Sequence, residues 1–173
     1  QSGGPMASGA EVAAAHERSV RQAYRAFDAR AIMPNFDREF ATLLVNFASW
    51  VSLLPASRNY HHAKPGGLFA HSLEVATKCL HYSMGHIVTQ DSLPRDREAD
   101  KFAWALAAFL VGLLHDIGKI HTIGDVVAHN VAIDPASSAF RSSAAPEYRL
   151  VWRPEVVPQA VWMKTYRIKS VRI

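Results

Sequence analysis

Cysteine is almost absent from this sequence. Cys79 is the only one among 173 residues, which excludes an internal disulfide and a cysteine-ligated metal cluster. A secretion signal, with its charged start, apolar core and cleavage site, is also missing. These absences predict an intracellular, reducing location.

Long apolar runs are missing as well. The longest uncharged apolar run extends from Phe102 to Leu114. A helix needs roughly 20 apolar residues to cross a bilayer, so this run predicts no membrane span.

Acidic residues are absent after Glu155, where Lys164, Arg167, Lys169 and Arg172 follow. This unevenness accompanies a net charge of +4. A basic end of this kind either contacts phosphate groups or is a solvated tail, and the sequence leaves both interpretations open. The composition, 49% hydrophobic and 20% charged, is typical of a folded globular chain of about one domain.

Three regions are predicted along the chain. Residues 1–9 are rich in Gly, Ser and Pro and contain Met6, so we expect them to be disordered or an artificial leader. Residues 10–122 are expected to form a helical domain. Residues 123–173 are expected to form a C-terminal extension with short strands or irregular structure, because β-favouring segments lie there between turn-forming residues.

Helical periodicity dominates the middle region. It predicts one amphipathic helix over Ala10–Ala31, and a second from Phe36 to Leu54 with Asn35 as its N-cap. A third helix is expected after Gly67, on the apolar positions Phe69 to Met84. A fourth is expected to begin near Pro94 and to be apolar all round from Phe102 to Leu114, as in a central buried helix. The predicted fold class is therefore mainly α.

Polar residues at the end of that apolar helix are the first indication of chemistry. His115 and Asp116 follow Leu114 directly, and such groups are costly to bury unless they are paired or bound to a metal. Imidazole and carboxylate ligands together suit Mn, Fe, Zn or Ni. A ligand from another helix must complete the site, and His71, just after the Gly66–Gly67 break, is the candidate.

Two ordered motifs resemble a known family. Gly-Gly-Leu-Phe-Ala-His-Ser-Leu-Glu-Val-Ala at 66–76 and Leu-Leu-His-Asp-Ile-Gly-Lys at 113–119 look like the HD superfamily of metal-dependent phosphohydrolases. The resemblance implies an HD-type helical bundle and a divalent metal (Mn, Fe, Zn, Ni or Mg) on His71, His115 and Asp116. It also implies hydrolysis at phosphorus by a metal-activated water.

A narrower resemblance covers roughly residues 36–121. The stretch Leu-Leu-Pro-Ala-Ser-Arg-Asn-Tyr-His-His-Ala-Lys-Pro-Gly-Gly-Leu-Phe-Ala-His-Ser-Leu-Glu-Val-Ala at 53–76 is similar to the N-terminal HD domain of TraI-type MOBH relaxases of conjugative plasmids and integrating elements. This similarity implies DNA as the partner, further conjugation proteins as additional partners, and the bacterial cytoplasm as the location.

The resemblance also assigns roles by position. His61 or His62 would lie at the mouth of the site, with His61 as a further metal ligand and His62 as a phosphate contact or proton donor. Asp116 would bridge two ions or orient the nucleophile. Lys119 would act on phosphate or the leaving group, although a lysine at a helix end also complements the helix dipole.

One departure from the HD pattern bears on activity. HD enzymes normally supply another aspartate from a later helix, whereas the only later aspartates here are Asp125 and Asp134, neither in a predicted helix. Asp125, Asp134, His121 and His129 are weak substitutes. Three functions stay open: a relaxase-like DNA phosphodiesterase or nuclease, a stand-alone phosphohydrolase of nucleotides or cyclic nucleotides, and a degenerate HD domain that binds DNA or protein without catalysis.

Overall fold

The computed structural model describes residues 8–27, 33–57, 59, 61–86, 91–123, 125–132, 150–152, 154, 159 and 166–172. Within these residues lie α1 (Gly9–Ala15), α2 (Glu17–Ala26), α3 (Phe36–Val51), α4 (Gly67–Met84), α5 (Arg97–Leu114), α6 (Lys119–Thr122), β1 (Asp125–Ala132), β2 (Leu150–Val151) and β3 (Tyr166–Arg172). The prediction of a mainly helical chain with strands near its C-terminal end is confirmed. The prediction for residues 1–9 lies outside the described part over 1–7 and is wrong at its end, because Ser8 caps α1 and the buried Gly9 is the first helical residue.

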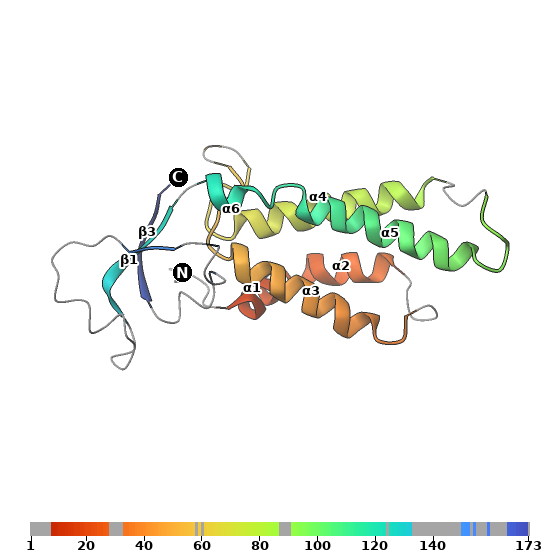
Figure 1. Ribbon diagram of the computed structural model, residues 1–173, viewed down its shortest axis with the longest axis horizontal. Coiled ribbons are helices and arrows are strands. Elements are labelled where there is room, and N and C mark those ends of the chain that lie inside the picture. The colour runs from red at the N-terminus through yellow and green to blue at the C-terminus, as the bar shows by residue number, and fades with distance from the viewer. Residues whose placement is uncertain are drawn as a thin grey trace.

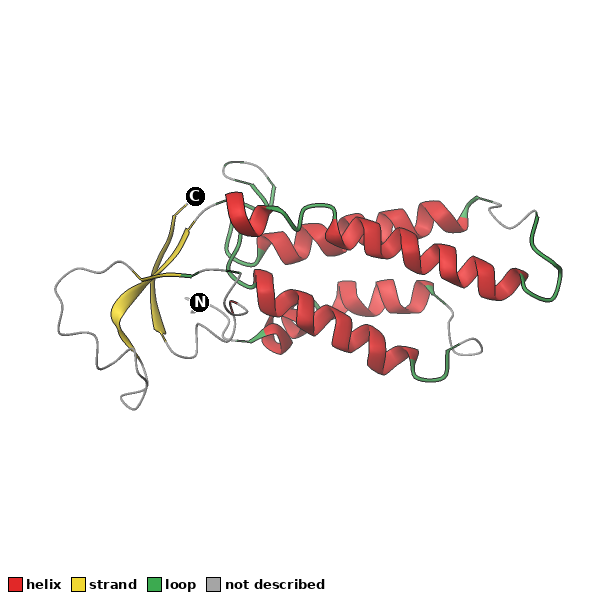
Figure 2. Ribbon diagram, viewed as in Figure 1, coloured by secondary structure: helices red, strands yellow, loops and turns green. Residues whose placement is uncertain are grey.

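The helices form an elongated bundle with the strands beyond one end. α4 and α5 run side by side, and α2 and α3 lie along them on the other side of the bundle (Figure 1). The short helix α6 follows α5 at the end of the bundle that faces the sheet (Figure 2). The loop before α4 and the end of α5 therefore meet at this same end.

The predicted single helix over Ala10–Ala31 is wrong, because His16 separates α1 from α2. His16 has φ −109° and ψ 21°, outside helical geometry, and serves as the C-cap of α1 and the N-cap of α2. Its ring lies 5.5 Å from the ring of Phe69 in α4, measured between centroids. A tertiary contact thus accompanies a break that the sequence pattern did not indicate.

Phenylalanines supply the core at the far end of the bundle. Phe36 and Phe40 of α3 are buried, as their periodicity predicts, and both pack against Phe27 at centroid distances of 5.0 and 5.6 Å. Phe109 of α5 completes the contact, 5.4 Å from Phe27. Burying each such side chain contributes roughly 1.5–3 kcal/mol, which fixes α3 and α5 relative to each other.

The prediction that α5 is buried all round is also wrong. Its buried residues are Ala105, Phe109, Gly112 and Leu113, which share the face toward the rest of the bundle, where Gly112 meets α4 and Phe109 meets Phe27 and Phe40. On other faces the exposed fractions are 55% for Trp104 and 69% for Val111. Within the described residues, α4 covers one side of α5, and an apolar run cannot by itself tell one-sided from complete burial.

One helical segment is both long enough and apolar enough to cross a membrane. Arg97–Thr122 has a mean hydropathy of 1.4 over its best window, with 22% of that window buried. Core helices of soluble proteins meet this criterion as well, so it does not show a membrane span.

The three strands form an antiparallel sheet in the order β2-β1-β3. β1 and β2 lie where the sequence predicts β-favouring segments. β3 instead occupies part of the segment expected to be a basic tail, and Arg167, Lys169 and Arg172 belong to it. Lys164 lies outside the described residues.

Two residues from the C-terminal region are buried. Trp152 is 3% exposed and belongs to the main core cluster. Gln159 is fully buried, and its Oε1 accepts hydrogen bonds from the Leu53 amide (2.5 Å) and the Ser52 hydroxyl (3.3 Å) at the end of α3. Trp152 and Gln159 therefore pack against the bundle.

Candidate metal centre

His71 lies in the second turn of α4. The chain enters this helix through Gly66, whose φ of 81° suits glycine, and Gly67 is the first helical residue. The neighbouring residues Phe69, Ser72 and Leu73 are buried. The position of His71 is therefore fixed by a packed helix, while its side chain is 30% exposed.

His115 and Asp116 lie where α5 ends. His115 is the C-cap of α5, and Asp116 belongs to the turn that leads to Lys119 at the start of α6. The side chains of His115 and Asp116 are 33% and 20% exposed, so solvent reaches the cluster.

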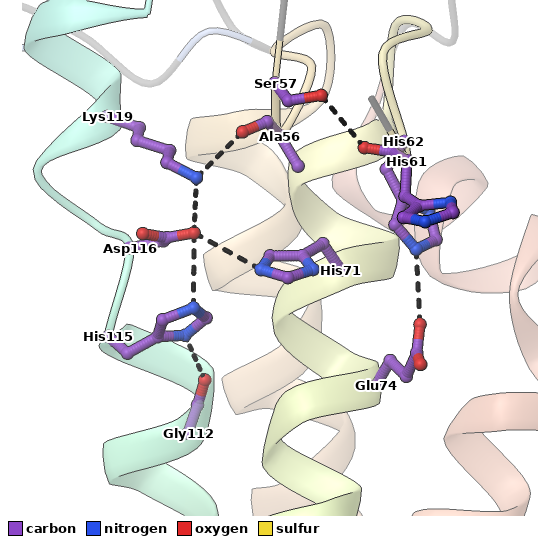
Figure 3. Close-up of polar contacts among 10 residues, drawn as sticks. All are labelled: Ala56, Ser57, His61, His62, His71, Glu74, Gly112, His115, Asp116 and Lys119. Carbon is purple, nitrogen blue, oxygen red and sulfur yellow. Dashed lines mark hydrogen bonds and ion pairs between the residues drawn. The ribbon is translucent and has the colours of Figure 1, made fainter. Parts of the chain in front are cut away.

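The structure brings these three predicted residues together. Asp116 Oδ2 lies 3.3 Å from His71 Nε2 and 3.2 Å from His115 Nε2 (Figure 3). One possible ligand atom from each of the three residues lies within 4.8 Å of the others. Two helices, α4 and α5, thus deliver two imidazoles and a carboxylate to one point.

The hydrogen bond of His115 determines which ring atom faces Asp116. His115 Nδ1 lies 2.7 Å from the Gly112 carbonyl oxygen, which only accepts, so Nδ1–H is the donor. In a neutral ring Nε2 then carries a lone pair, and this lone pair faces a carboxylate oxygen. The lone pair and the carboxylate oxygen repel each other, and either a proton on Nε2 or a cation bound by both atoms removes this repulsion. Histidines that bind metals commonly donate their other ring N–H to a backbone carbonyl in this way.

Two of the three distances between ligand atoms also fit an ion. Two donor atoms that each lie about 2.1 Å from one ion, at the angles of tetrahedral or octahedral sites, are roughly 3.0–3.4 Å apart. The two distances from Asp116 Oδ2, 3.2 and 3.3 Å, lie in this range. The donor set of two nitrogens and one oxygen suits Mn, Fe, Zn or Ni.

Lys119 holds the same carboxylate oxygen from the other side. Its Nζ donates to Asp116 Oδ2 at 2.6 Å and to the Ala56 carbonyl at 2.8 Å. Ala56 in turn donates its amide to the His62 carbonyl at 3.0 Å. Lys119 therefore connects α6 to the loop before α4.

These contacts shift two pKa values. Burial raises the pKa of Asp116, but the Lys119 hydrogen bond and the charges of His115, Lys119 and His71 together outweigh it and hold that pKa below its ordinary range. Burial lowers the pKa of His71, and although the Asp116 charge opposes it, the charges of His115, Lys119 and His62 act in the same direction as burial. The histidine is thus biased toward the neutral form that binds metals.

His62 lies beside the cluster. Its ring centroid is 5.8 Å from that of His71, and its Nε2 lies 3.2 Å from Glu74 Oε2. Its φ of 60° is unusual for a residue other than glycine. A Cβ on Gly67 would lie only 1.8 Å from the His62 carbonyl oxygen, so the strained turn is held by close backbone packing.

The structure does not bring His61 into the ligand cluster. Its side chain is exposed, and its carbonyl accepts a hydrogen bond from Ser57 Oγ at 3.1 Å (Figure 3). Its role as a ligand stays a prediction, as does the role of His62 in catalysis.

Among the weaker candidates, the side chain of His121 is described, and it is not part of the cluster. His121 is exposed on α6, whereas Asp125 and His129 belong to β1 and Asp134 lies outside the described residues. None of the side chains that the structure describes adds a further aspartate to His71, His115 and Asp116.

Two contacts around the cluster, those of Ala56 and Glu74, were not predicted from the sequence. Ala56 contributes only backbone atoms, and an alanine gives no sequence signal for that role. Glu74 pairs with Lys78 at 2.6 Å, as i,i+4 spacing on a helix favours. Its second contact, with His62, comes from a loop and required the fold.

Comparison with known proteins gives a family. The model of the family TraI_2, described as "Putative helicase", matches residues 11–146. No curated protein and no solved structure matches the chain. The match covers α1 to α6, including His71, His115 and Asp116. Since it spans well over half of the sequence, this chain belongs to the TraI_2 family of TraI-related conjugative-transfer proteins.

Proposed function

We propose that this chain is an HD-type domain that binds a divalent metal and cleaves phosphodiester bonds in DNA during conjugative transfer. The observation that carries the proposal is Asp116 Oδ2, which faces two imidazole nitrogens at 3.2 and 3.3 Å. Membership of a TraI-related family supports DNA as the substrate.

His71, His115 and Asp116 would hold the ion. When bound, Mn, Fe, Zn, Ni or Mg would lower the pKa of water and neutralise charge on phosphate oxygens. The Gly112 carbonyl fixes the ring of His115 through Nδ1, and Lys119 fixes the carboxylate of Asp116. The chain thus orients the ligands before substrate arrives, which is how a site limits the cost of reorganisation.

Two further side chains are assigned to the phosphate. The Lys119 ammonium, beside Asp116, is placed to stabilise negative charge on a phosphate oxygen or on the leaving oxygen. His62 Nδ1 is the ring atom not engaged by Glu74, so it is the atom that would donate a proton to the leaving oxygen.

A second function has one observation in its favour. Without any ion, Asp116 already has Lys119, His71 and His115 around it, so its charge is compensated within the chain. Such a cluster also suits a degenerate HD domain that binds DNA or protein without catalysis.

Metal content separates the two. We would measure it by elemental analysis on wild type, His115→Ala, Asp116→Ala and, as a matched control, His81→Ala. His81 is an exposed histidine of α4 far along the helix from His71. We expect close to one ion per chain in wild type and His81→Ala, and loss of the ion in the other two variants.

Cleavage of single-stranded DNA by the loaded protein, lost in the same two variants, would then support the nuclease. If wild type takes up no Mn, Fe, Zn, Ni or Mg after incubation and dialysis, the hydrolase proposal fails and the binding domain becomes the better account.

A further inference from the structure

A groove beside the ligand cluster is lined by one lysine and two histidines that the proposed chemistry does not use fully. It has a volume of about 430 Å³ and lies between the α1–α2 junction and the loop before α4. Its polar side chains are His16, His62 and Lys64, and small residues such as Gly66, Gly67 and Ala70 form much of the remainder. None of its lining residues is acidic. We call it the flanking groove.

His16 is the least expected member of this lining. Its ring is half-buried against Phe69, and it makes no side-chain cap to α2, although it occupies the N-cap position. Burial lowers its pKa, and the charge of His62 adds to this effect. Both imidazoles line the same groove, where a ring N–H of each can donate to an anion.

Lys64 supplies a permanent charge. Its side chain is exposed, and among the described residues no carboxylate pairs with it. Glu74 is close to the groove through His62, but Lys78 also pairs with Glu74 at 2.6 Å and compensates its charge. The groove thus keeps an excess of positive charge.

The helix terminus is not what makes this groove suitable for an anion. The amides of Gly67 and Leu68 already donate to the carbonyls of Lys64 and Leu54, both at 2.9 Å. Recognition would therefore depend on the side chains of His16, His62 and Lys64, which match a phosphate group with several acceptor oxygens.

His62 is shared by the groove and the cluster, because its ring lines the groove and lies 5.8 Å from the ring of His71. A ligand that reaches both must carry two neighbouring anionic groups. We propose that the flanking groove binds the phosphate next to the scissile phosphodiester, so that the substrate is a single strand of DNA and not a mononucleotide. This inference rests on the proposed function for the position of the scissile group.

The test measures binding without metal, so that it does not depend on cleavage. Fluorescence anisotropy with a labelled short oligothymidylate would compare wild type with His16→Gln and Lys64→Ala, with thymidine 5′-monophosphate as a competitor. Lys101→Ala, an exposed lysine of α5 outside the groove, is the matched control. Circular dichroism would verify that His16→Gln folds. If His16→Gln does not fold, Lys64→Ala alone still tests the proposal, because Lys64 is exposed.

We expect Lys64→Ala to weaken oligonucleotide binding about tenfold, as for loss of a charge-assisted hydrogen bond, and His16→Gln to weaken it about threefold, as for loss of a neutral one. The slope of log affinity against log salt concentration should decrease in Lys64→Ala by the amount expected for about one phosphate contact, and it should recover in Lys64→Arg. Affinity for the mononucleotide should change less than about twofold in either variant, as should oligonucleotide binding in Lys101→Ala. Equal losses for oligonucleotide and mononucleotide, or no loss in Lys64→Ala, would overturn the flanking groove.

These outcomes are independent of the metal result. If the protein binds no metal but Lys64→Ala weakens oligonucleotide binding, the hydrolase proposal is wrong and the flanking-groove proposal stands. If the protein binds metal but neither substitution changes oligonucleotide binding, the hydrolase proposal stands and the flanking-groove proposal is wrong.

Discussion

Gly112 of α5 packs directly on Ala76 of α4. A Cβ at residue 112 would lie 2.6 Å from Ala76 Cα and 2.9 Å from Ala76 N, so only glycine permits this approach of the two backbones. The same glycine accepts the hydrogen bond from His115 Nδ1 through its carbonyl. The contact that joins the helices therefore also sets the distance between His71 and His115.

Gly112→Ala should destabilise the protein and disturb the ligand cluster. The added methyl forces two backbones apart at about 1–3 kcal/mol, and the better helix propensity of alanine recovers at most about 1 kcal/mol. We expect a lower free energy of unfolding in urea and weaker metal binding.

Gly118→Ala is the matched control, because nothing lies within 4 Å of a Cβ at that position and its φ is −59°. It should leave stability unchanged or slightly raised. Equal stability of the two variants would show that α4 and α5 are not as close as described here.

Lys119→Met should lower the stability of the metal-free protein. The substitution leaves Asp116 without its closest cation and the Ala56 carbonyl without its donor, at a cost of about 1–2 kcal/mol for these partly exposed groups. Urea denaturation at neutral pH with chelator present would measure it. Lys119→Arg keeps the positive charge, so its free energy of unfolding should decrease less than that of Lys119→Met. Equal decreases in the two variants would mean that the charge does not contribute to stability.

The metal-free protein should lose stability as the pH falls below about 6.5. His16 and His71 have pKa values lowered from the ordinary 6.5, both chiefly by burial, so the unfolded chain binds protons that the folded chain does not. A second loss should follow at acidic pH, where Glu74 and Asp116 have pKa values below the ordinary 4.5 and 3.8. For Glu74 the hydrogen bonds from Lys78 and His62 are the main cause.

Unfolding in urea at a series of pH values between 8 and 3 would measure this dependence. These groups contribute no change above pH 7. Stability that rises as the pH falls from 6.5 to 5.5 would contradict the assigned shifts of both histidines.

Gln159→Ala should destabilise the protein by about 1–3 kcal/mol, because the buried amide of Leu53 loses its acceptor. Thermal unfolding followed by circular dichroism would detect the change. Ser72→Ala provides a contrast, since the Ser72 hydroxyl is buried with no hydrogen-bond partner among the described residues. Its removal should be neutral or stabilising, and a loss equal to that of Gln159→Ala would show an unrecognised partner.

Much of the helical fold could be predicted from periodicity. The stripe that includes Phe36 and Phe40 predicted α3, and the apolar positions after Gly67 predicted α4, because one buried face repeats every 3.6 residues. The break at His16 and the exposure of Trp104 could not be predicted. Both depend on which neighbours pack against a helix, and the pattern within one helix does not contain that information.

The C-terminal region shows the same limit. β3 carries Arg167 and Lys169, and its basic character suggested a tail. A strand is defined by hydrogen bonds to a partner, here β1, which lies far away in the sequence.

For the candidate site, the sequence by itself determined which residue types are candidate ligands. His115 and Asp116 at the end of an apolar helix, with His71 after a glycine pair, are chemically recognisable because polar groups at such positions need partners. Only the tertiary structure decided that these ligands converge, that Lys119 reaches Ala56 and Asp116, and that His16 joins His62 across a groove. The physical reason is that side-chain distances between separate helices follow from their packing, and here that packing depends on the absence of a Cβ at Gly112.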